Sequence, residues 1–258
     1  MSFFGRILNK NLINPEVKNS VLIGRGNITD NFPSDFTEEE KSNIAFIKGL
    51  SMTSIERQVS LIRAIDYIVK SHIEGDIVEC GVWKGGSMML IAKRLLQLND
   101  HKRNLFLFDT FEGMSEPNEE DVNSVDNKTA QELLAKENKF DGNNVWCYSS
   151  LDEVKSNLKK TNYPEEKLFY FKGKVEETLP EPSIGKIALL RLDTDWYEST
   201  MHELEALYDK LVEGGVLIID DYGHWSGSKK AVDEFIEKRK LRIFLNRIDY
   251  TGRLAIKI

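Results

Sequence analysis

The chain has 258 residues, 41% of them hydrophobic and 30% charged, a composition typical of one globular protein of enzyme size. Its 35 Lys and Arg against 42 Asp and Glu give a net charge of −7, which argues against nucleic-acid binding. No apolar run approaches the roughly 20 residues that a membrane-spanning helix needs. Two widely separated cysteines and the lack of a signal-peptide pattern favour a cytoplasmic location with reduced thiols.

The first 73 residues fall into two segments. Residues 1–37 mix apolar pairs with Arg6 and Lys10, and we expect an arm that packs on the protein or on a second subunit, so that a homo-oligomer is the expected assembly. Residues 37–73 carry apolar side chains at helical spacing, which predicts two helices joined at Ser51–Ser54, with Ser54 as an N-cap. We therefore divide the chain into an N-terminal arm and helical cap, 1–73, and a main domain, 74–258.

From Gly75 onwards, short apolar runs alternate with helix-length segments, a pattern typical of a parallel sheet with crossover helices. Seven runs are predicted strands: Asp76–Cys80, Asn104–Asp109, Lys167–Phe171, Lys186–Asp193, Gly215–Asp220, Leu241–Leu245 and Arg253–Ile258. The last two are too close in sequence for a crossover helix, so they predict an antiparallel hairpin. The expected fold is α/β, a Rossmann-like, seven-stranded, mostly parallel sheet with a terminal antiparallel hairpin.

A glycine-rich turn, Glu79–Ser87, follows the first predicted strand. Glycine lets the backbone approach a ligand, and the start of the next helix offers free N–H groups to an anion. The spacing of Gly81, Gly85 and Gly86 fits neither the dinucleotide-binding GxGxxG pattern nor a P-loop. Asp109, at the end of the next strand, is placed to accept hydrogen bonds from a ribose. Together these features favour S-adenosylmethionine over NAD.

Four aspartates follow two later strands: Asp193 and Asp195 after one, Asp220 and Asp221 after the other. The carboxyl ends of neighbouring parallel strands face one crevice, so we expect these side chains to converge near the glycine-rich turn. Crowded carboxylates need a cation to offset their repulsion, and oxygen ligands suit Mg²⁺. The sequence therefore predicts a magnesium site.

Two further features are candidate parts of the same site. His224 comes three residues after the second acidic pair and is a candidate for a role near the substrate. The acidic stretch 112–126 is expected to be a loop, either a cover over the site or a solvated insertion.

Five stretches between about Ser51 and Lys238 resemble the macrocin O-methyltransferase family. In chain order they are Glu79–Ser87, Phe108–Gly113, Lys172–Pro180, Arg191–Thr200 and Gly214–Tyr222. The fourth and fifth, which contain the four aspartates, are the most specific. The resemblance implies a class I methyltransferase fold and an enzyme that uses S-adenosylmethionine and Mg²⁺ to methylate a hydroxyl of a sugar or glycosylated metabolite.

The resemblance also assigns roles to particular residues. It implies that Asp193, Asp220 and Asp221 bind the metal and that Asp193 or Asp195 is the catalytic base. It implies cofactor contacts at Met52, Thr53, Glu79, Gly81, Val82, Trp83, Gly85, Ser87, Asp109, Thr110 and Phe111. Trp196 stands where the related catechol-type enzymes have a lysine base, which argues against a phenol acceptor.

Two other functions remain open on the sequence. An NAD-dependent, sugar-modifying oxidoreductase could use Asp109 for a nicotinamide ribose, although the pyrophosphate fingerprint is missing. A non-catalytic binding protein could keep the same fold, although the four aspartates and the glycine-rich turn argue against it. The acceptor itself is not identified by the sequence.

Overall fold

A computed structural model describes residues 32–142 and 144–258, so most of the predicted N-terminal arm lies outside the described residues. The strands are β1 Asp76–Cys80, β2 Leu105–Asp109, β3 Leu168–Lys172, β4 Ile187–Leu192, β5 Leu211–Ile219, β6 Asn246–Arg247 and β7 Arg253–Ile256. The helices are α2 Glu38–Phe46, α3 Ile55–Lys70, α4 Gly86–Gln97, α5 Ala130–Lys136, α6 Leu151–Lys159, α7 Val175–Thr178, α8 Tyr197–Leu207 and α9 Ser226–Arg239.

The strands form one sheet in the order β3-β2-β1-β4-β5-β7-β6. Neighbouring strands from β3 to β5 are parallel, β7 runs antiparallel to β5, and β6 pairs antiparallel with β7. The predicted fold class is confirmed. The order reverses between β1 and β4, and in open α/β sheets this is the point at which ligands bind.

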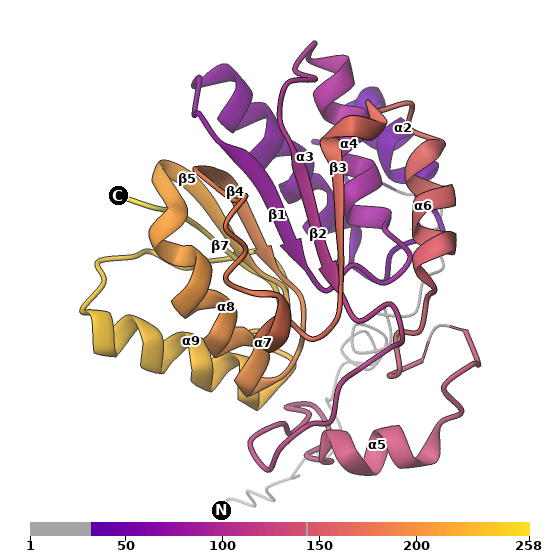
Figure 1. Ribbon diagram of the computed structural model, residues 1–258, viewed down its shortest axis with the longest axis vertical. Helices are drawn as coiled ribbons and strands as arrows, with labels where there is room; N and C mark the ends of the chain where they lie inside the picture. The colour runs from indigo at the N-terminus through magenta and orange to yellow at the C-terminus, as the bar shows by residue number, and fades with distance from the viewer. Residues whose placement is uncertain (1–31, 143) are drawn as a thin grey trace, which may run out of the picture.

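Helices cover both faces of the sheet (Figure 1). Helices α2, α3, α4 and α6 lie on one face and α7, α8 and α9 on the other. Successive residues of β1 serve opposite faces, so Ile77 belongs to the core under α3 and α4, and Val78 to the core under α8 and α9. In α3, Ile65 and Ile68 are completely buried, so the predicted helical cap shares its core with the sheet.

The two predicted N-terminal helices are both present. The Thr37 side chain and the Glu40 side chain form a capping box at the start of α2. The Ser54 hydroxyl accepts a hydrogen bond from the Arg57 amide at 3.1 Å and caps α3, as predicted. No helix in the described ranges is long and apolar enough to cross a bilayer.

The terminal hairpin is present, but the prediction of its first strand was wrong. Strand β6 is Asn246–Arg247, and the predicted strand Leu241–Leu245 has no ladder partner among the described strands. Its alternating apolar residues, Leu241, Ile243 and Leu245, pack partly buried against the core under α8 and α9. The period of two thus reflects packing on one side of an extended segment, which the sequence pattern alone does not distinguish from a strand.

The β2–β3 insertion, which runs from the end of β2 to the start of α6 and contains α5, extends beyond the carboxyl ends of the strands (Figure 1). Its acidic part is fixed to the starts of α8 and α9. The Asp121 carboxylate is completely buried and accepts hydrogen bonds from the amides of Tyr197 and Asn118, both at 2.8 Å. Trp196 and Trp225 pack edge to face beneath the insertion, with ring centroids 4.9 Å apart. The stretch predicted as a loop is therefore docked on the body of the protein.

Candidate active site

A cavity of about 1130 Å³ opens at the carboxyl ends of the central strands. Its walls are residues 47–58, the glycine-rich turn, the ends of β2, β4 and β5, and parts of the β2–β3 insertion. Pockets for small molecules usually measure about 300–1,000 Å³. The cavity therefore has room for a cofactor and a second small molecule side by side.

Close contacts with neighbouring backbone explain why glycine is needed at positions 81 and 86 of the turn. Gly81 has a φ of +81°, and a Cβ there would lie 2.0 Å from the Asp193 carbonyl oxygen. A Cβ at Gly86 would lie 2.2 Å from the Leu50 carbonyl oxygen, to which the Gly86 amide donates at 3.0 Å. The turn is thus in direct contact with the loop after β4 on one side and with residue 50 on the other.

Asp109 holds the turn in place. Its Oδ2 accepts hydrogen bonds from the amides of Val82 at 2.6 Å and Trp83 at 3.0 Å, and its Oδ1 accepts from the Phe111 amide at 2.7 Å. A carboxylate has about four lone-pair positions, so little of its capacity is left for a ligand. Burial raises the pKa of Asp109, and these backbone hydrogen bonds act against that rise.

Eight of the eleven predicted cofactor residues line the cavity: Met52, Thr53, Gly81, Val82, Trp83, Ser87, Asp109 and Thr110. The other three lie behind its wall. Glu79 is 1% exposed and pairs with Arg191, and Phe111 is 2% exposed in the core. Gly85 is the left-handed N-cap of α4 and packs against Leu158. These three residues support the turn from behind.

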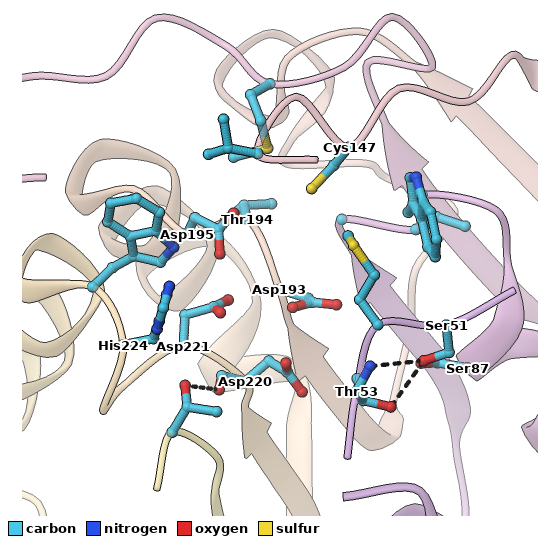
Figure 2. A pocket seen from close by; sticks show the side chains of 18 of the residues that line it. Ser51, Thr53, Ser87, Cys147, Asp193, Thr194, Asp195, Asp220, Asp221 and His224 are labelled. Carbon is cyan, nitrogen blue, oxygen red and sulfur yellow. Dashed lines mark hydrogen bonds between the residues drawn. The ribbon is translucent and has the colours of Figure 1, made fainter. Parts of the chain in front are cut away.

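The four aspartates point into one space, with His224 on one side and Ser51 and Thr53 on the other (Figure 2). Asp193, Asp195 and Asp221 each place a carboxylate oxygen within 4.8 Å of the others. The Asp221 Oδ2 atom is buried and has no hydrogen-bond partner among the described residues.

Burial and mutual repulsion raise the pKa values of these three carboxyl groups. The pKa of Asp195 rises to about 7, and the pKa values of Asp193 and Asp221 rise well above their usual range. Asp195 also has a φ of +69°, an uncommon backbone conformation for a residue other than glycine. A cation bound among these groups would offset their repulsion.

Asp220, the fourth aspartate, is held between two arginines. Its Oδ1 accepts a hydrogen bond from Arg191 at 2.6 Å, and its Oδ2 pairs with Arg57. Burial opposes ionisation, but the two guanidinium groups lower the pKa of Asp220 below its ordinary value. Arg191 also donates to Glu79 at 2.5 Å and to Asp193 at 2.6 Å, so it joins the first strand to both acidic pairs.

Both arginines were missed by the sequence analysis as functional residues. Arg191 lies two residues before Asp193, and its position inside a buried strand was a usable signal, because a buried arginine needs acidic partners. Arg57 gave no such signal. It stands in an amphipathic helix, where an arginine is most simply read as solvent-exposed.

An uncharged polar strip, formed by Asn123, His224 and Tyr250, lines the cavity beside Asp221. The His224 ring lies between the other two, with Nε2 3.2 Å from the Asn123 amide nitrogen and Nδ1 3.2 Å from the Tyr250 hydroxyl. Because the amide nitrogen donates, Nε2 accepts and the ring proton is on Nδ1. Burial lowers the pKa of His224, which favours this neutral form. Asn123 and Tyr250 were also missed by the sequence analysis.

Residues 28–255 match the family model of the macrocin O-methyltransferases (TylF). The chain belongs to this family. Its members are O-methyltransferases, so the predicted enzyme class is confirmed, and the alternative of an NAD-dependent oxidoreductase finds no support.

Individual relatives agree with this assignment. The chain is 32% identical to demethyldecarbamoylnovobiocin O-methyltransferase of Streptomyces niveus, over 78% of the chain and 73% of the relative. It is 27% identical to mycinamicin III 3''-O-methyltransferase of Micromonospora griseorubida, over 78% and 76%. The solved structure of the O-methyltransferase NovP is similar with a TM-score of 0.69 at 29% identity, covering 81% of this chain and 82% of that one.

Proposed function

We propose that this O-methyltransferase transfers a methyl group from S-adenosylmethionine to a hydroxyl of a sugar or glycosylated metabolite, with a divalent cation such as Mg²⁺ at the aspartates. One observation carries the proposal. The glycine-rich turn and the acidic cluster formed by Asp193, Asp195, Asp220 and Asp221 share one cavity, and they touch through the backbones of Gly81 and Asp193. The names of relatives that act on mycinamicin III and on a rhamnosyl-tetracenomycin support a sugar-bearing acceptor.

The aspartates fit a divalent cation. They are hard oxygen ligands, three of them converge, and one buried oxygen of Asp221 lacks a partner among the described residues. Asp193 and Asp221 belong both to the converging trio and to the set implied by the resemblance. Asp220 would complete the ligand set that the resemblance implies. When bound, the cation would polarise an acceptor hydroxyl and hold a neighbouring hydroxyl, which is the chemistry that a sugar offers.

The cavity also fits the cofactor. The backbone of Gly81 and the side chains of Met52, Thr53 and Ser87 face it, and the turn begins helix α4, whose N-terminus favours the carboxylate of the methionine end. Ribose binding at Asp109 stays a prediction. The three backbone hydrogen bonds that this carboxylate already accepts indicate that its first role is to fix the turn.

Chemically, the acceptor oxygen forms a bond to the methyl carbon while the bond from carbon to the cofactor sulfur breaks, and a carboxylate takes the hydroxyl proton. This requires the two reacting atoms about 3–3.5 Å apart and in line. We assign the proton to Asp195. Asp193 is paired with Arg191, whereas Asp195 has no arginine partner among the described residues, so its carboxylate is the freer of the two to accept the proton.

We assign the acceptor to the side of the cavity beside the polar strip. The four aspartates separate His224 from Ser51 and Thr53 (Figure 2), so a cofactor on the Thr53 side leaves the His224 side for the acceptor. The Asn123 amide and the Tyr250 hydroxyl can exchange hydrogen bonds with sugar hydroxyls. The strip carries no charge, which suits an uncharged, polyhydroxylated ring.

The test is a methyl-transfer screen with labelled S-adenosylmethionine against nucleotide sugars, polysaccharide fragments and glycosylated metabolites, with Mg²⁺ or with EDTA. Asp193→Asn should lower turnover about a hundredfold or more, because it removes a proposed metal ligand. Its affinity for S-adenosylhomocysteine should stay within about threefold of wild type. Near-normal turnover of this variant would contradict the role of Asp193.

A thermal-shift titration tests the cofactor separately. S-adenosylhomocysteine should raise the melting temperature and NAD should not, because only a ligand of the folded state stabilises it. Stabilisation by NAD alone would refute the proposed cofactor.

A further inference from the structure

Arg57 reaches from the first turn of α3 into the acidic cluster. Only 10% of its side chain is exposed, and its guanidinium pairs with Asp220 and, at 3.0 Å, with Asp249 in the turn between β6 and β7. Asp249 is itself fixed, because its Oδ1 accepts hydrogen bonds from the Thr251 amide at 2.9 Å and the Gly252 amide at 2.7 Å. The arginine thus joins the start of α3 to the end of β5 and to the terminal hairpin.

The segment that Arg57 holds lines the cofactor side of the cavity. Residues 50–54 lead into α3, and all of them line the cavity. Their first residue contacts the glycine-rich turn, through the hydrogen bond from the Gly86 amide to the Leu50 carbonyl. Their last, Ser54, donates to Asp249 at 2.7 Å. The segment therefore spans from the glycine-rich turn to Asp249 and is hydrogen-bonded at both ends.

The same guanidinium carries a positive charge where the proposed cation would bind. The Asp220 Oδ2 atom already pairs with Arg57, so a metal ion that binds this oxygen must compete with the guanidinium. A positive charge at this position also raises the electrostatic energy of a divalent cation beside it. The arginine should therefore weaken cation binding while it supports the segment at residues 50–54.

We propose that Arg57 is a positioning residue that fastens residues 50–54 to Asp220 and Asp249 and competes with the divalent cation for Asp220. It thereby supports cofactor binding and opposes cation binding. This inference rests on the proposed function, since the cation site is proposed there.

The test uses Arg57→Met in the full chain, which removes the charge and keeps most of the aliphatic volume. S-adenosylhomocysteine affinity, measured by isothermal titration, should fall on the order of tenfold, because residues 50–54 lose an anchor. Mn²⁺ affinity, measured by electron paramagnetic resonance of the free ion, should rise on the order of tenfold, because a competing positive charge is gone. A merely structural role would weaken both.

Arg57→Lys provides a second variant in case the methionine variant does not fold. It keeps the charge but cannot form the same fork between two carboxylates. Cofactor affinity should fall several-fold, and Mn²⁺ affinity should stay within about twofold of wild type. Arg63→Met is the matched control: Arg63 lies on the same helix, its side chain is 47% exposed, and it pairs with Asp35 and Glu40 away from the cavity, so its loss should leave both affinities unchanged.

Three outcomes would overturn the inference. Loss of both affinities in Arg57→Met would reduce the residue to a general support of the fold. Unchanged affinities in both Arg57 variants would show that the contacts have no consequence for binding. Wild-type protein that binds S-adenosylhomocysteine but no Mn²⁺ would refute the proposed cation and the competition together, an outcome distinct from the first two.

Discussion

The pKa of Asp195 leads to a prediction about stability in the absence of metal. Its carboxyl group titrates at about 7 in the folded protein, because it is buried beside other aspartates, against an ordinary value of 3.8. Between these two values the folded state holds a proton that the unfolded state has lost. The metal-free protein should therefore lose stability as the pH rises through this window.

The size of the effect follows from the two pKa values. At about pH 5.5 and at about pH 8 the unfolded carboxyl is ionised, whereas the folded one changes from mostly protonated to mostly ionised. This change removes about 2 kcal/mol of stability. For a chain of this size the melting temperature falls by about 4–8 °C.

The assay is thermal or urea unfolding in EDTA at both pH values, for wild type and for Asp195→Asn. The variant cannot ionise at this position, so its loss of stability should be smaller than that of wild type by about 2 kcal/mol. Adding Mg²⁺ at the higher pH should restore the stability that the wild-type protein has lost, because the cation offsets the ionised aspartates. Equal pH dependence in the two proteins would refute the reasoning.

Three further substitutions test other parts of the structure. Arg191→Met should cost about 3–5 kcal/mol in urea unfolding, because it leaves buried carboxylates without their partner; a cost near zero would show that they are neutral. Gly227→Ala places a Cβ 1.9 Å from the Asp121 carboxylate, so hydrogen exchange in residues 114–129 should accelerate, and unchanged exchange would contradict the docking. Tyr250→Phe should raise the KM for the acceptor several-fold and leave the affinity for S-adenosylhomocysteine unchanged, whereas an unchanged KM would remove Tyr250 from the acceptor side.

The central strands and their helices were predictable because their patterns are local. A strand such as β2 is a continuous apolar run, as a strand buried on both faces must be, and Asp109 marks its end. The capping of α3 by Ser54 was readable for the same reason. Leu241–Leu245 failed because an extended segment that packs on one side has the same alternation as a strand.

The site was partly predictable. The convergence of the four aspartates follows from parallel strands that end at one edge, and this geometry is independent of side-chain detail. The contacts of Arg57 were not predictable, since they join residues 57, 220 and 249 through tertiary packing. The role of Glu79 was likewise hidden, because the sequence does not show on which side of the turn its side chain lies.

The contact between Gly81 and Asp193 has an evolutionary consequence. The separation between the glycine-rich turn and the loop of Asp193 is set there by main-chain atoms, so side-chain replacements elsewhere leave it unchanged. The β2–β3 insertion, which forms another part of the cavity wall, is anchored through the separate Asp121 carboxylate. On the proposed mechanism, substitutions in that wall can change the fit of the acceptor while the spacing between the turn and the aspartates stays the same.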